Sequence, residues 1–243
     1  MNEDFFGEQV AERYDASESD EFSPSEIEAT VAFLADLVRG GSALELGIGT
    51  GRIALPLHAR GIRVHGIDLS SAMVARLRAK PGAHEIGVTV GDFAKSTVDA
   101  KFSLAYLVFN TIMNLTSQDE QVACFQNVAG QLEPGGHFVI EVLVPDLQRL
   151  APGETIRPFA VTSTRLGFDE YDVVTQSLTS HHYWNDDGHF DSVAIPFRYV
   201  WPSELDLMAR LAGMTLVQRW AGWQREPFTG ESAKHVSVWK LDG

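Results

Sequence analysis

Hydrophobic positions along the chain change their period several times, and each change marks a predicted element. From residue 43 to residue 144, short continuous apolar runs alternate with segments in which apolar residues recur at helical spacing. Continuous apolar runs between helices predict a parallel sheet that helices cover on both faces. The predicted strands are 43–46, 64–67, 86–90, 102–109 and 137–144, and the predicted helices are 52–60, 70–80 and 117–132.

Two further helices are predicted ahead of this alternation. The first covers residues 5–15. The second begins after Ser23, where a Ser-x-x-Glu pattern with Pro24 at the first helical position is typical of a helix N-terminus. Its apolar residues keep helical spacing up to the glycine pair at 40–41. We expect residues 1–40 to form an N-terminal helical lid.

After residue 154 the pattern becomes β-like, with β-branched and aromatic residues in alternating runs. The runs are 159–166, 172–184 and 190–199, and Asn185-Asp186-Asp187-Gly188 predicts a hairpin turn between the last two. We therefore expect residues 155–200 to form an antiparallel β insertion over a pocket for the substrate. The remaining predictions are a helix over 204–212 with Ser203 as its N-cap, and an antiparallel strand pair, 214–223 and 235–241.

These elements predict an α/β fold of Rossmann-like type, a seven-stranded and mostly parallel sheet with helices on both faces and the insertion after the fifth parallel strand. Residues 41–154 and 201–243 would form its core. A length of 243 residues with 44% hydrophobic and 21% charged residues fits one such domain. No apolar run approaches the roughly 18 residues of a membrane helix. The acidic start lacks the basic region of a secretory signal, so we expect a cytoplasmic protein.

Charge and cysteine content restrict the kinds of partner. The chain has 33 acidic and 19 basic residues, a net charge of −14, and its basic residues are scattered rather than clustered. This argues against a nucleic-acid-binding face and is compatible with a cationic ligand. The single cysteine, Cys124, lies in a helical pattern and is expected to be a buried, inert thiol. His181, His182 and His189 have no carboxylate spacing that supports a metal site, so no metal is expected.

The strongest chemical signal is Gly47-Ile48-Gly49-Thr50-Gly51, placed between the first predicted strand and its helix. Glycines at alternate positions allow a sharp turn and let a ligand lie against bare backbone. Asp68 ends the next strand, about 20 residues on, where an acid can accept both hydroxyls of a ribose. A dinucleotide site uses G-x-G-x-x-G instead. The spacing here therefore favours a different nucleoside ligand.

With Glu45 before the first glycine and Gly91-Asp92-Phe93 after the third strand, this motif set resembles the class I S-adenosylmethionine-dependent methyltransferases. The resemblance covers about residues 42–143. Tyr14-Asp15 and the antiparallel insertion are similar to features of small-molecule members, including amino-sugar N-methyltransferases of natural-product pathways. In that family the N-terminal helix closes over the cofactor. The resemblance implies S-adenosyl-L-methionine as the cofactor.

The resemblance also implies a role for each matching position. Glu45 would orient the glycine turn, the three glycines would line the cofactor, Asp68 would bind ribose, and Asp92 would accept from the adenine amino group. Asn110 would lie between the cofactor and the methyl acceptor, and Tyr14 would line the active site. The complete set of predicted cofactor-binding residues is Tyr14, Glu45, Gly47, Gly49, Gly51, Asp68, Leu69, Met73, Asp92, Phe93 and Asn110.

The predicted catalytic residues are Tyr14, Asn110 and His181. Methyl transfer needs an in-line arrangement and exclusion of water, and an O–H or protonated amine acceptor also needs a general base. Other candidates for the general base are His182, Tyr183 and Glu141. Side chains alternate between the two faces of a strand, so at most one of His181 and His182 faces a pocket.

The residues that follow the fourth predicted strand restrict the class of molecule that can accept the methyl group. Phe109-Asn110-Thr111-Ile112 lacks the Asn/Asp-Pro-Pro-aromatic run of methyltransferases that act on base or glutamine amines. We therefore expect methyl transfer to nitrogen or oxygen of a small metabolite such as a natural-product sugar or intermediate, without nucleic acid or membrane partners. Two alternative functions stay open: a non-catalytic relative that binds the nucleoside, and a nicotinamide-dependent oxidoreductase. The protein could also form a homodimer.

Overall fold

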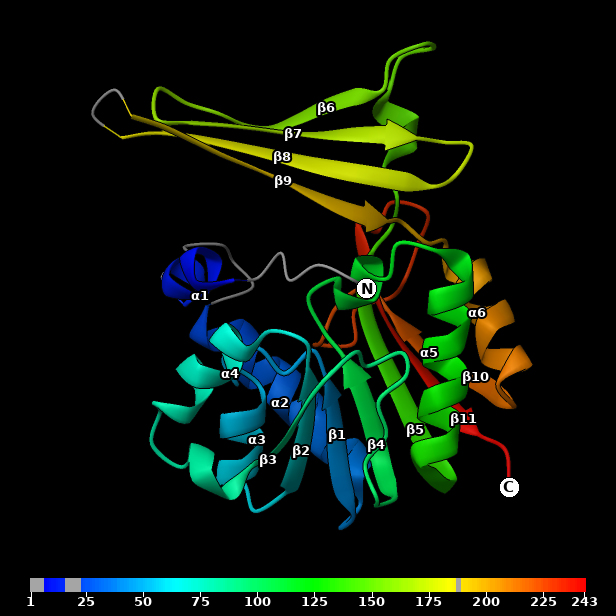
Figure 1. Ribbon diagram of the computed structural model, residues 1–243. Helices are drawn as coiled ribbons and strands as arrows, with labels where there is room; N and C mark the ends of the chain where they lie inside the picture. The colour runs from blue at the N-terminus through cyan, green and yellow to red at the C-terminus, as the bar shows by residue number, and fades with distance from the viewer. Residues whose placement is uncertain (1–6, 16–22, 187–188) are drawn as a thin grey trace.

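Seven strands form the main sheet in the order β10-β11-β5-β4-β1-β2-β3 (Figure 1). The computed structural model describes residues 7–15, 23–186 and 189–243. Neighbouring strands from β5 to β3 run parallel, whereas β11 is antiparallel to both β5 and β10. The predicted fold class is therefore confirmed. The strands are β1 Ser42–Leu46, β2 Arg63–Asp68, β3 Gly87–Val90, β4 Phe102–Leu107, β5 Leu132–Leu143, β10 Met214–Trp220 and β11 Lys234–Leu241.

Helices pack on both faces of this sheet and create two hydrophobic clusters (Figure 1). One face carries α2 (Pro24–Val38), α3 (Ala54–Ala59) and α4 (Ser71–Arg78), and the other carries α5 (Gln118–Gln131) and α6 (Pro202–Leu211). The shorter helices are α1 Glu8–Tyr14, η2 Ala83–Glu85, η3 Thr111–Asn114 and η4 Leu147–Arg149. No helix in these described ranges is long and apolar enough to cross a bilayer.

Side-chain hydrogen bonds cap the first turns of α2 and α5, and of these the Ser23 cap was predicted from the sequence. Ser23 accepts the backbone N–H of Glu26, with Pro24 in the first helical turn of α2. Ser117 and Glu120 form a reciprocal capping box at α5. The Glu26 carboxylate instead binds Lys234 Nζ at 2.8 Å, which ties α2 to β11. A polar side chain at a helix start thus also joins elements distant in sequence.

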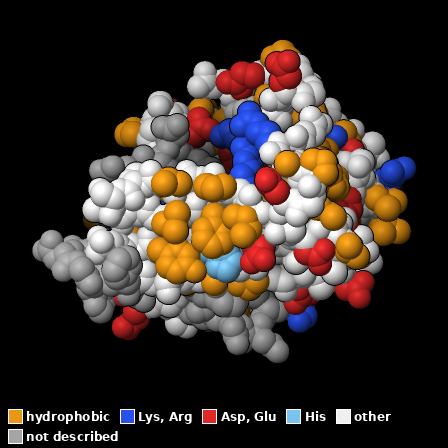
Figure 2. All heavy atoms as spheres, turned by 90° about the horizontal axis from the view of Figure 1, so that it is seen from above, with side chains coloured by type: hydrophobic (Ala, Val, Ile, Leu, Met, Phe, Trp, Pro, Cys, Tyr) orange, Lys and Arg blue, Asp and Glu red, His pale blue; other side chains and the backbone are white. Residues whose placement is uncertain are grey.

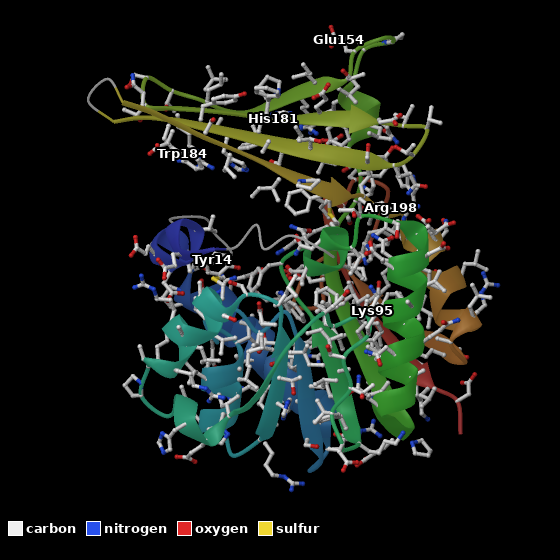
Figure 3. The ribbon with its side chains drawn as sticks, viewed as in Figure 1. Tyr14, Lys95, Glu154, His181, Trp184 and Arg198 are labelled. Atoms are coloured by element: carbon white, nitrogen blue, oxygen red, sulfur yellow. The ribbon has the colours of Figure 1, made fainter. Side chains whose placement is uncertain are left out.

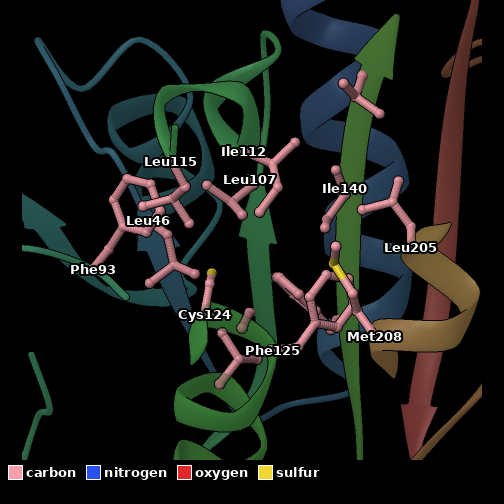
Figure 4. Close-up of a cluster of buried hydrophobic side chains, with 14 of the residues drawn as sticks. Leu46, Phe93, Leu107, Ile112, Leu115, Cys124, Phe125, Ile140, Leu205 and Met208 are labelled. Atoms are coloured by element: carbon pink, nitrogen blue, oxygen red, sulfur yellow. The ribbon is translucent and has the colours of Figure 1, made fainter. Parts of the chain in front are cut away.

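The cluster beneath α5 and α6 shows why Cys124 is inert (Figure 4). Phe125 packs edge-on against Phe138 and Trp239, with ring centroids 5.0 and 5.6 Å away. Cys124 lies fully buried beside it, and this burial raises the pKa of its thiol. A thiol with a raised pKa stays protonated and is a poor nucleophile.

The insertion is a separate four-stranded antiparallel sheet in the order β6-β7-β8-β9, one strand more than predicted. The predicted runs 159–166 and 172–184 are each divided by a turn: Thr162 Oγ1 accepts the backbone N–H of Arg165, and Asp172 Oδ1 accepts that of Val174. Asp187 and Gly188 of the predicted hairpin lie outside the described residues, but Asp186 pairs with His189 as a hairpin requires. The strands are β6 Ile156–Val161, β7 Arg165–Asp172, β8 Ser177–Asp186 and β9 His189–Arg198.

Three other boundaries differ from the sequence prediction. Ser203 is not the N-cap of α6, because Pro202 already occupies its first turn and Trp201 is the cap. The glycines at 135–136 lie within β5, where the pairing with β4 shifts register between Phe102 and Leu104. The last predicted strand pair is shorter, since β10 ends at Trp220.

The insertion sheet lies above the carboxyl ends of the parallel strands, and α1 lies beneath one end of it (Figure 1). Seen from above, hydrophobic side chains gather on the outer surface of the molecule (Figure 2). Most of the exposed large hydrophobic residues belong to the insertion, among them Val161, Leu166 and Tyr183. The inner surface of the insertion faces the end of the main sheet at which open α/β folds bind ligands.

Candidate functional site

The glycine turn after β1 has the backbone that its sequence predicts. Gly47, Gly49 and Gly51 have φ values of 72°, 53° and 78°, a region that favours glycine. A Cβ on Gly47 would lie 2.6 Å from Thr111 Cγ2, and one on Gly51 would lie 2.3 Å from Leu77 Cδ1. The turn therefore approaches η3 on one side and α4 on the other, and only bare backbone fits between them.

Asp68 connects this turn to the two other predicted motifs. Its Oδ2 accepts the N–H of Gly49 at 2.6 Å, and its Oδ1 accepts the N–H of Ser70 at 2.8 Å. Its backbone carbonyl accepts the N–H of Gly91, just before Asp92, at 2.8 Å. Each carboxylate oxygen has two lone pairs, so an oxygen that accepts an amide N–H can also accept a hydroxyl group.

Glu45 is a buried carboxyl at the base of the turn. Tyr106 on the adjacent strand β4 donates its hydroxyl to Glu45 Oε2 at 3.0 Å. Burial raises the pKa of Glu45 to about 8, and the Tyr106 hydrogen bond and the charge of Arg52 only partly offset this. A cation bound beside this carboxyl would favour its ionised form. The site is thus suited to a positively charged ligand.

The turn after β4 contains two consecutive residues in the left-handed region, Phe109 with φ 56° and Asn110 with φ 62°. Asparagine tolerates this conformation but phenylalanine does not, so the turn stores strain of the kind found at functional sites. Asn110 Oδ1 accepts the N–H of Leu143 at 2.7 Å, and Phe109 N–H donates to Glu141 Oε2 at 3.2 Å. These contacts hold the ends of β4 and β5 together beside the glycine turn.

Arg52 stacks on this turn and also reaches α1. Its guanidinium carbon lies 3.6 Å from the Phe109 ring centroid and 5.7 Å from that of Tyr14. The sequence prediction missed Arg52, although it directly follows the glycine motif. Arg52 joins the N-terminal helix, the glycine turn and the β4 turn in one cluster.

Asp15, which follows α1, binds the glycine turn directly. Its Oδ1 accepts the Thr50 hydroxyl at 2.6 Å, and its Oδ2 pairs with Lys80 Nζ at 2.6 Å. Lys80 also donates to the Thr50 carbonyl at 2.8 Å. Burial tends to raise the pKa of Asp15, but the bonds from Lys80 and Thr50 outweigh it and lower the pKa. No sequence signal marked Lys80, because only the fold brings α4 to α1.

The remaining predicted cofactor residues lie along the same edge of the sheet. Asp92 Oδ1 accepts the N–H of Ala94 at 2.9 Å, and Met73 is buried next to Gly49. The Phe93 side chain belongs to the core (Figure 4), so only its backbone remains for a ligand. Leu69 is half-buried at the end of β2. The structure brings these residues together, and their contact with a cofactor stays a prediction.

The two histidines of β8 lie on opposite faces of the insertion sheet. His182 lines a cavity of ≈ 230 Å³ with Tyr14 and Trp184, beneath the sheet and beside α1 (Figure 3). His181 therefore lies on the outer face, where it stacks on Phe168 and approaches Glu170 at 3.2 Å. The geometry does not support the predicted catalytic role of His181, and it brings His182 to Tyr14 instead.

A second, larger cavity of ≈ 970 Å³ lies under β6 and β7 at the end of β5. Its walls include Leu143, Phe159, Asp169 and Tyr171. The Phe159 ring of this cavity lies 5.2 Å from the His182 ring of the smaller one, so the two cavities are neighbours beneath the insertion. In the described ranges, no group of three or more His, Cys, Asp or Glu residues could hold a metal ion.

A doubly wound sheet with a glycine turn opposite an acidic strand end defines a nucleoside-binding α/β protein. Comparisons with known proteins make this more specific. The chain matches the model of a methyltransferase domain family over residues 43–136. It is 36% identical to the CcbJ methyltransferase from Streptomyces caelestis, whose structure superposes with a TM-score of 0.89 and full coverage of both chains.

Two other relatives extend this comparison. Cypemycin N-terminal methyltransferase from Streptomyces sp is 27% identical over 206 residues, which is 82% of this chain and 82% of that protein. The structure of S-adenosylmethionine-bound CalS10, an amino pentose methyltransferase from Micromonospora echinaspora, shares the fold with 19% identity and a TM-score of 0.70 over 98% of this chain and 99% of that one. The chain belongs to the S-adenosylmethionine-dependent methyltransferases, and S-adenosylmethionine is its cofactor.

Proposed function

We propose that this enzyme methylates an amine nitrogen of a small natural-product intermediate, either an amino sugar or a peptide with a free N-terminus. The observation that carries the proposal is the pair of neighbouring cavities beneath the insertion. Tyr14 lines the smaller one and also belongs to the Tyr14–Arg52–Phe109 cluster beside the glycine turn. Relatives named for an amino pentose and for a peptide N-terminus support both acceptor types. The chemical feature that an amino pentose and an N-terminus share is an amino group.

The proposal gives each region of the chain a part in binding. Residues 41–154 and 201–243 hold the cofactor through the glycine turn, Asp68 and Asp92. Within residues 1–40, α1 acts as a lid, which Asp15 ties to the turn through Thr50 and Lys80, whereas α2 packs on the main sheet. Residues 155–200 cover the acceptor.

Methyl transfer from this cofactor requires correct alignment of the amine more than it requires a specialised catalytic side chain. S-adenosylmethionine supplies an activated methyl group on a sulfonium, and the protein aligns the amine with it. The strained β4 turn, fixed by Asn110 Oδ1 and Glu141, sets the wall between the two ligands. The insertion and α1 exclude water, which would otherwise compete as an acceptor.

The test is a radiolabel-transfer assay with the whole protein. S-adenosylmethionine labelled in its methyl group is incubated with D-glucosamine or an alanyl tripeptide, with glucose and the N-acetylated tripeptide as matched controls that lack a free amine. We expect label only in the free amines. Transfer to the controls at an equal rate, or S-adenosylhomocysteine binding without any transfer, would contradict the proposal, the latter favouring a non-catalytic nucleoside-binding relative.

A further inference from the structure

Three polar side chains lie in a row on the inner face of the insertion. Asp169 on β7 is the direct cross-strand partner of Ser180 on β8, and burial raises the pKa of Asp169 while the Ser180 hydroxyl opposes this shift. Ser180 Oγ lies 3.1 Å from His182 Nε2. A Ser180 hydroxyl that donates to the Asp169 carboxylate leaves its oxygen as the acceptor for His182. In this arrangement the proton of the neutral imidazole lies on Nε2.

The other imidazole nitrogen has an unused lone pair. His182 Nδ1 is buried and has no hydrogen-bond partner. Buried polar atoms without a partner are rare in proteins, and each calls for an explanation such as a missing ligand. The ring lines the ≈ 230 Å³ cavity with Tyr14 and lies parallel to the Trp184 ring, with centroids 5.7 Å apart. Stacking and the Ser180 bond together fix the orientation of the ring.

We propose that His182 Nδ1 accepts the N–H of the acceptor amine during methyl transfer, and that Ser180 and Asp169 are positioning residues that hold His182 in the required tautomer. This inference rests on the proposed function. The nitrogen lone pair forms the new N–C bond as the methyl C–S bond breaks, and that electron pair goes to sulfur. The amine proton passes to Nδ1, and the resulting imidazolium returns it to solvent.

Apolar and aromatic side chains line most of this cavity, which defines the acceptor further. Val10 of α1 and Val193 and Ile195 of β9 complete its walls with Tyr14 and Trp184. Such a surface fits an amine on a ring or side chain with an apolar face, since apolar and aromatic walls with a few polar groups are typical of small-molecule sites.

Charged groups around His182 decide its protonation. Arg165 of β7 and Asp191 of β9 line the same cavity, and Tyr14 faces it from α1. Burial lowers the pKa of His182, and the charges of Arg165 and His181 lower it further. A histidine with a pKa below its usual value is neutral at neutral pH and can accept a hydrogen bond. Its function is lost when the pH falls through that pKa.

The test compares His182→Asn with His181→Asn, a matched control at the adjacent position on the opposite face of the sheet. With the free amine that the radiolabel assay identifies, we expect His182→Asn to lower kcat/KM by about 100-fold, typical for loss of a group that takes a proton in the transition state. His181→Asn should stay near the wild type at pH values above the acid limb of the profile, and it should move that limb in the same direction as Arg165→Gln. Binding of S-adenosylhomocysteine by calorimetry should be unchanged in both variants.

Two further measurements separate this role from a structural one. Arg165→Gln should move the acid limb of the kcat/KM profile to higher pH, because it removes a charge that lowers the pKa of His182. Ser180→Ala should lower kcat, and Ser180→Thr, which keeps the hydroxyl, should restore it. Nitrogen-15 spectra of the histidines should show His182 as the Nε2–H tautomer.

The inference fails if His182→Asn behaves like His181→Asn while the wild type methylates the amine, an outcome that leaves the proposed function intact. An Nδ1–H tautomer for His182 would overturn it equally, whether or not the acceptor is known.

Discussion

Glu45 has a buried side chain whose ionisation is opposed by its surroundings. Because burial raises the pKa of the folded-state carboxyl to about 8, against its ordinary value of 4.5, the folded protein holds a proton that the unfolded chain releases between these values. The free energy of unfolding should therefore fall as pH rises through this window, with a slope of at most about 1.4 kcal/mol per pH unit. Glu45→Gln, which mimics the protonated form, should lack this slope.

Urea unfolding of both proteins at pH 5, 6.5 and 8, without cofactor, measures the effect. We expect similar stability at pH 5 and a wild type that is progressively weaker than Glu45→Gln towards pH 8. Parallel pH profiles of the two proteins would show that Glu45 ionises at its ordinary pKa.

Adding a single carbon atom at Gly47 tests whether the glycine turn contacts the cofactor. Gly47→Ala places a Cβ 2.6 Å from Thr111 Cγ2 on a residue with φ 72°. Gly61→Ala is the matched control, because its φ is 83° but its Cβ would meet nothing within 4 Å. Both variants should lose about 1 kcal/mol or more from backbone strain.

Only Gly47→Ala should also weaken S-adenosylhomocysteine binding, about tenfold or more, because the clash moves the turn. Calorimetry and thermal unfolding measure the two quantities. Equal affinity of the two variants for the nucleoside would mean that the turn does not contact it.

At the level of single residues, the sequence predicted the motif positions but not their partners. Asp68 and the glycines could be read from spacing, since strand ends of a parallel sheet meet at one edge. The choice between His181 and His182 could not be made from the sequence. The alternation of side chains along a strand shows only that the two residues lie on opposite faces. The orientation of the insertion sheet decides which face points inward. Arg52 and Lys80 gain their roles from the approach of α1, a contact with no local signature.

The insertion is held to the main sheet by a buried polar junction at the end of β9. Arg198 donates to Gln121 Oε1 of α5 at 2.6 Å and to Glu204 Oε1 of α6 at 2.7 Å. Burial tends to raise the pKa of Glu204, but hydrogen bonds from Arg198 and two glutamines outweigh it and lower the pKa. An intact junction of this kind keeps the substrate-covering sheet in a fixed position relative to the core.

Arg198→Met should therefore destabilise the protein by about 3–5 kcal/mol, because it leaves a buried carboxylate without its cation. The double variant Arg198→Met with Glu204→Gln should recover part of this loss, since no unpaired charge remains. Chemical unfolding of the wild type and the variants measures the coupling. A single variant within about 1 kcal/mol of the wild type would mean that the pair is effectively solvated.

Element type was predictable wherever one period persisted, as for the parallel strands and α2 and α5. The extra strand of the insertion was missed because the turns after Val161 and Asp172 contain no glycine or proline. They are built by Thr162 and Asp172 side chains that bind their own backbone, a device whose sequence signature is weak. The strand β4 ends early for a similar reason, since the strained pair at 109–110 has no turn motif.

Across the whole molecule, acidic side chains outnumber basic ones by 33 to 19, for a net charge of −14. A field of one sign raises the rate at which ligands of the opposite sign arrive, and salt screens it. S-adenosylmethionine carries a sulfonium cation that S-adenosylhomocysteine lacks, so the two nucleosides form a matched pair that differs by one charge near the reacting atom.

The association rate of S-adenosylmethionine should therefore fall several-fold when salt is raised from about 0.01 M to about 0.1 M, as the Debye length shortens from about 30 Å to about 10 Å. That of S-adenosylhomocysteine should change much less. Stopped-flow measurement of the change in intrinsic tryptophan fluorescence on binding gives both rates. An equal salt dependence for the two would show that the net charge does not act at the site, and that the suitability of the site for a cation depends on Glu45 and its immediate neighbours alone.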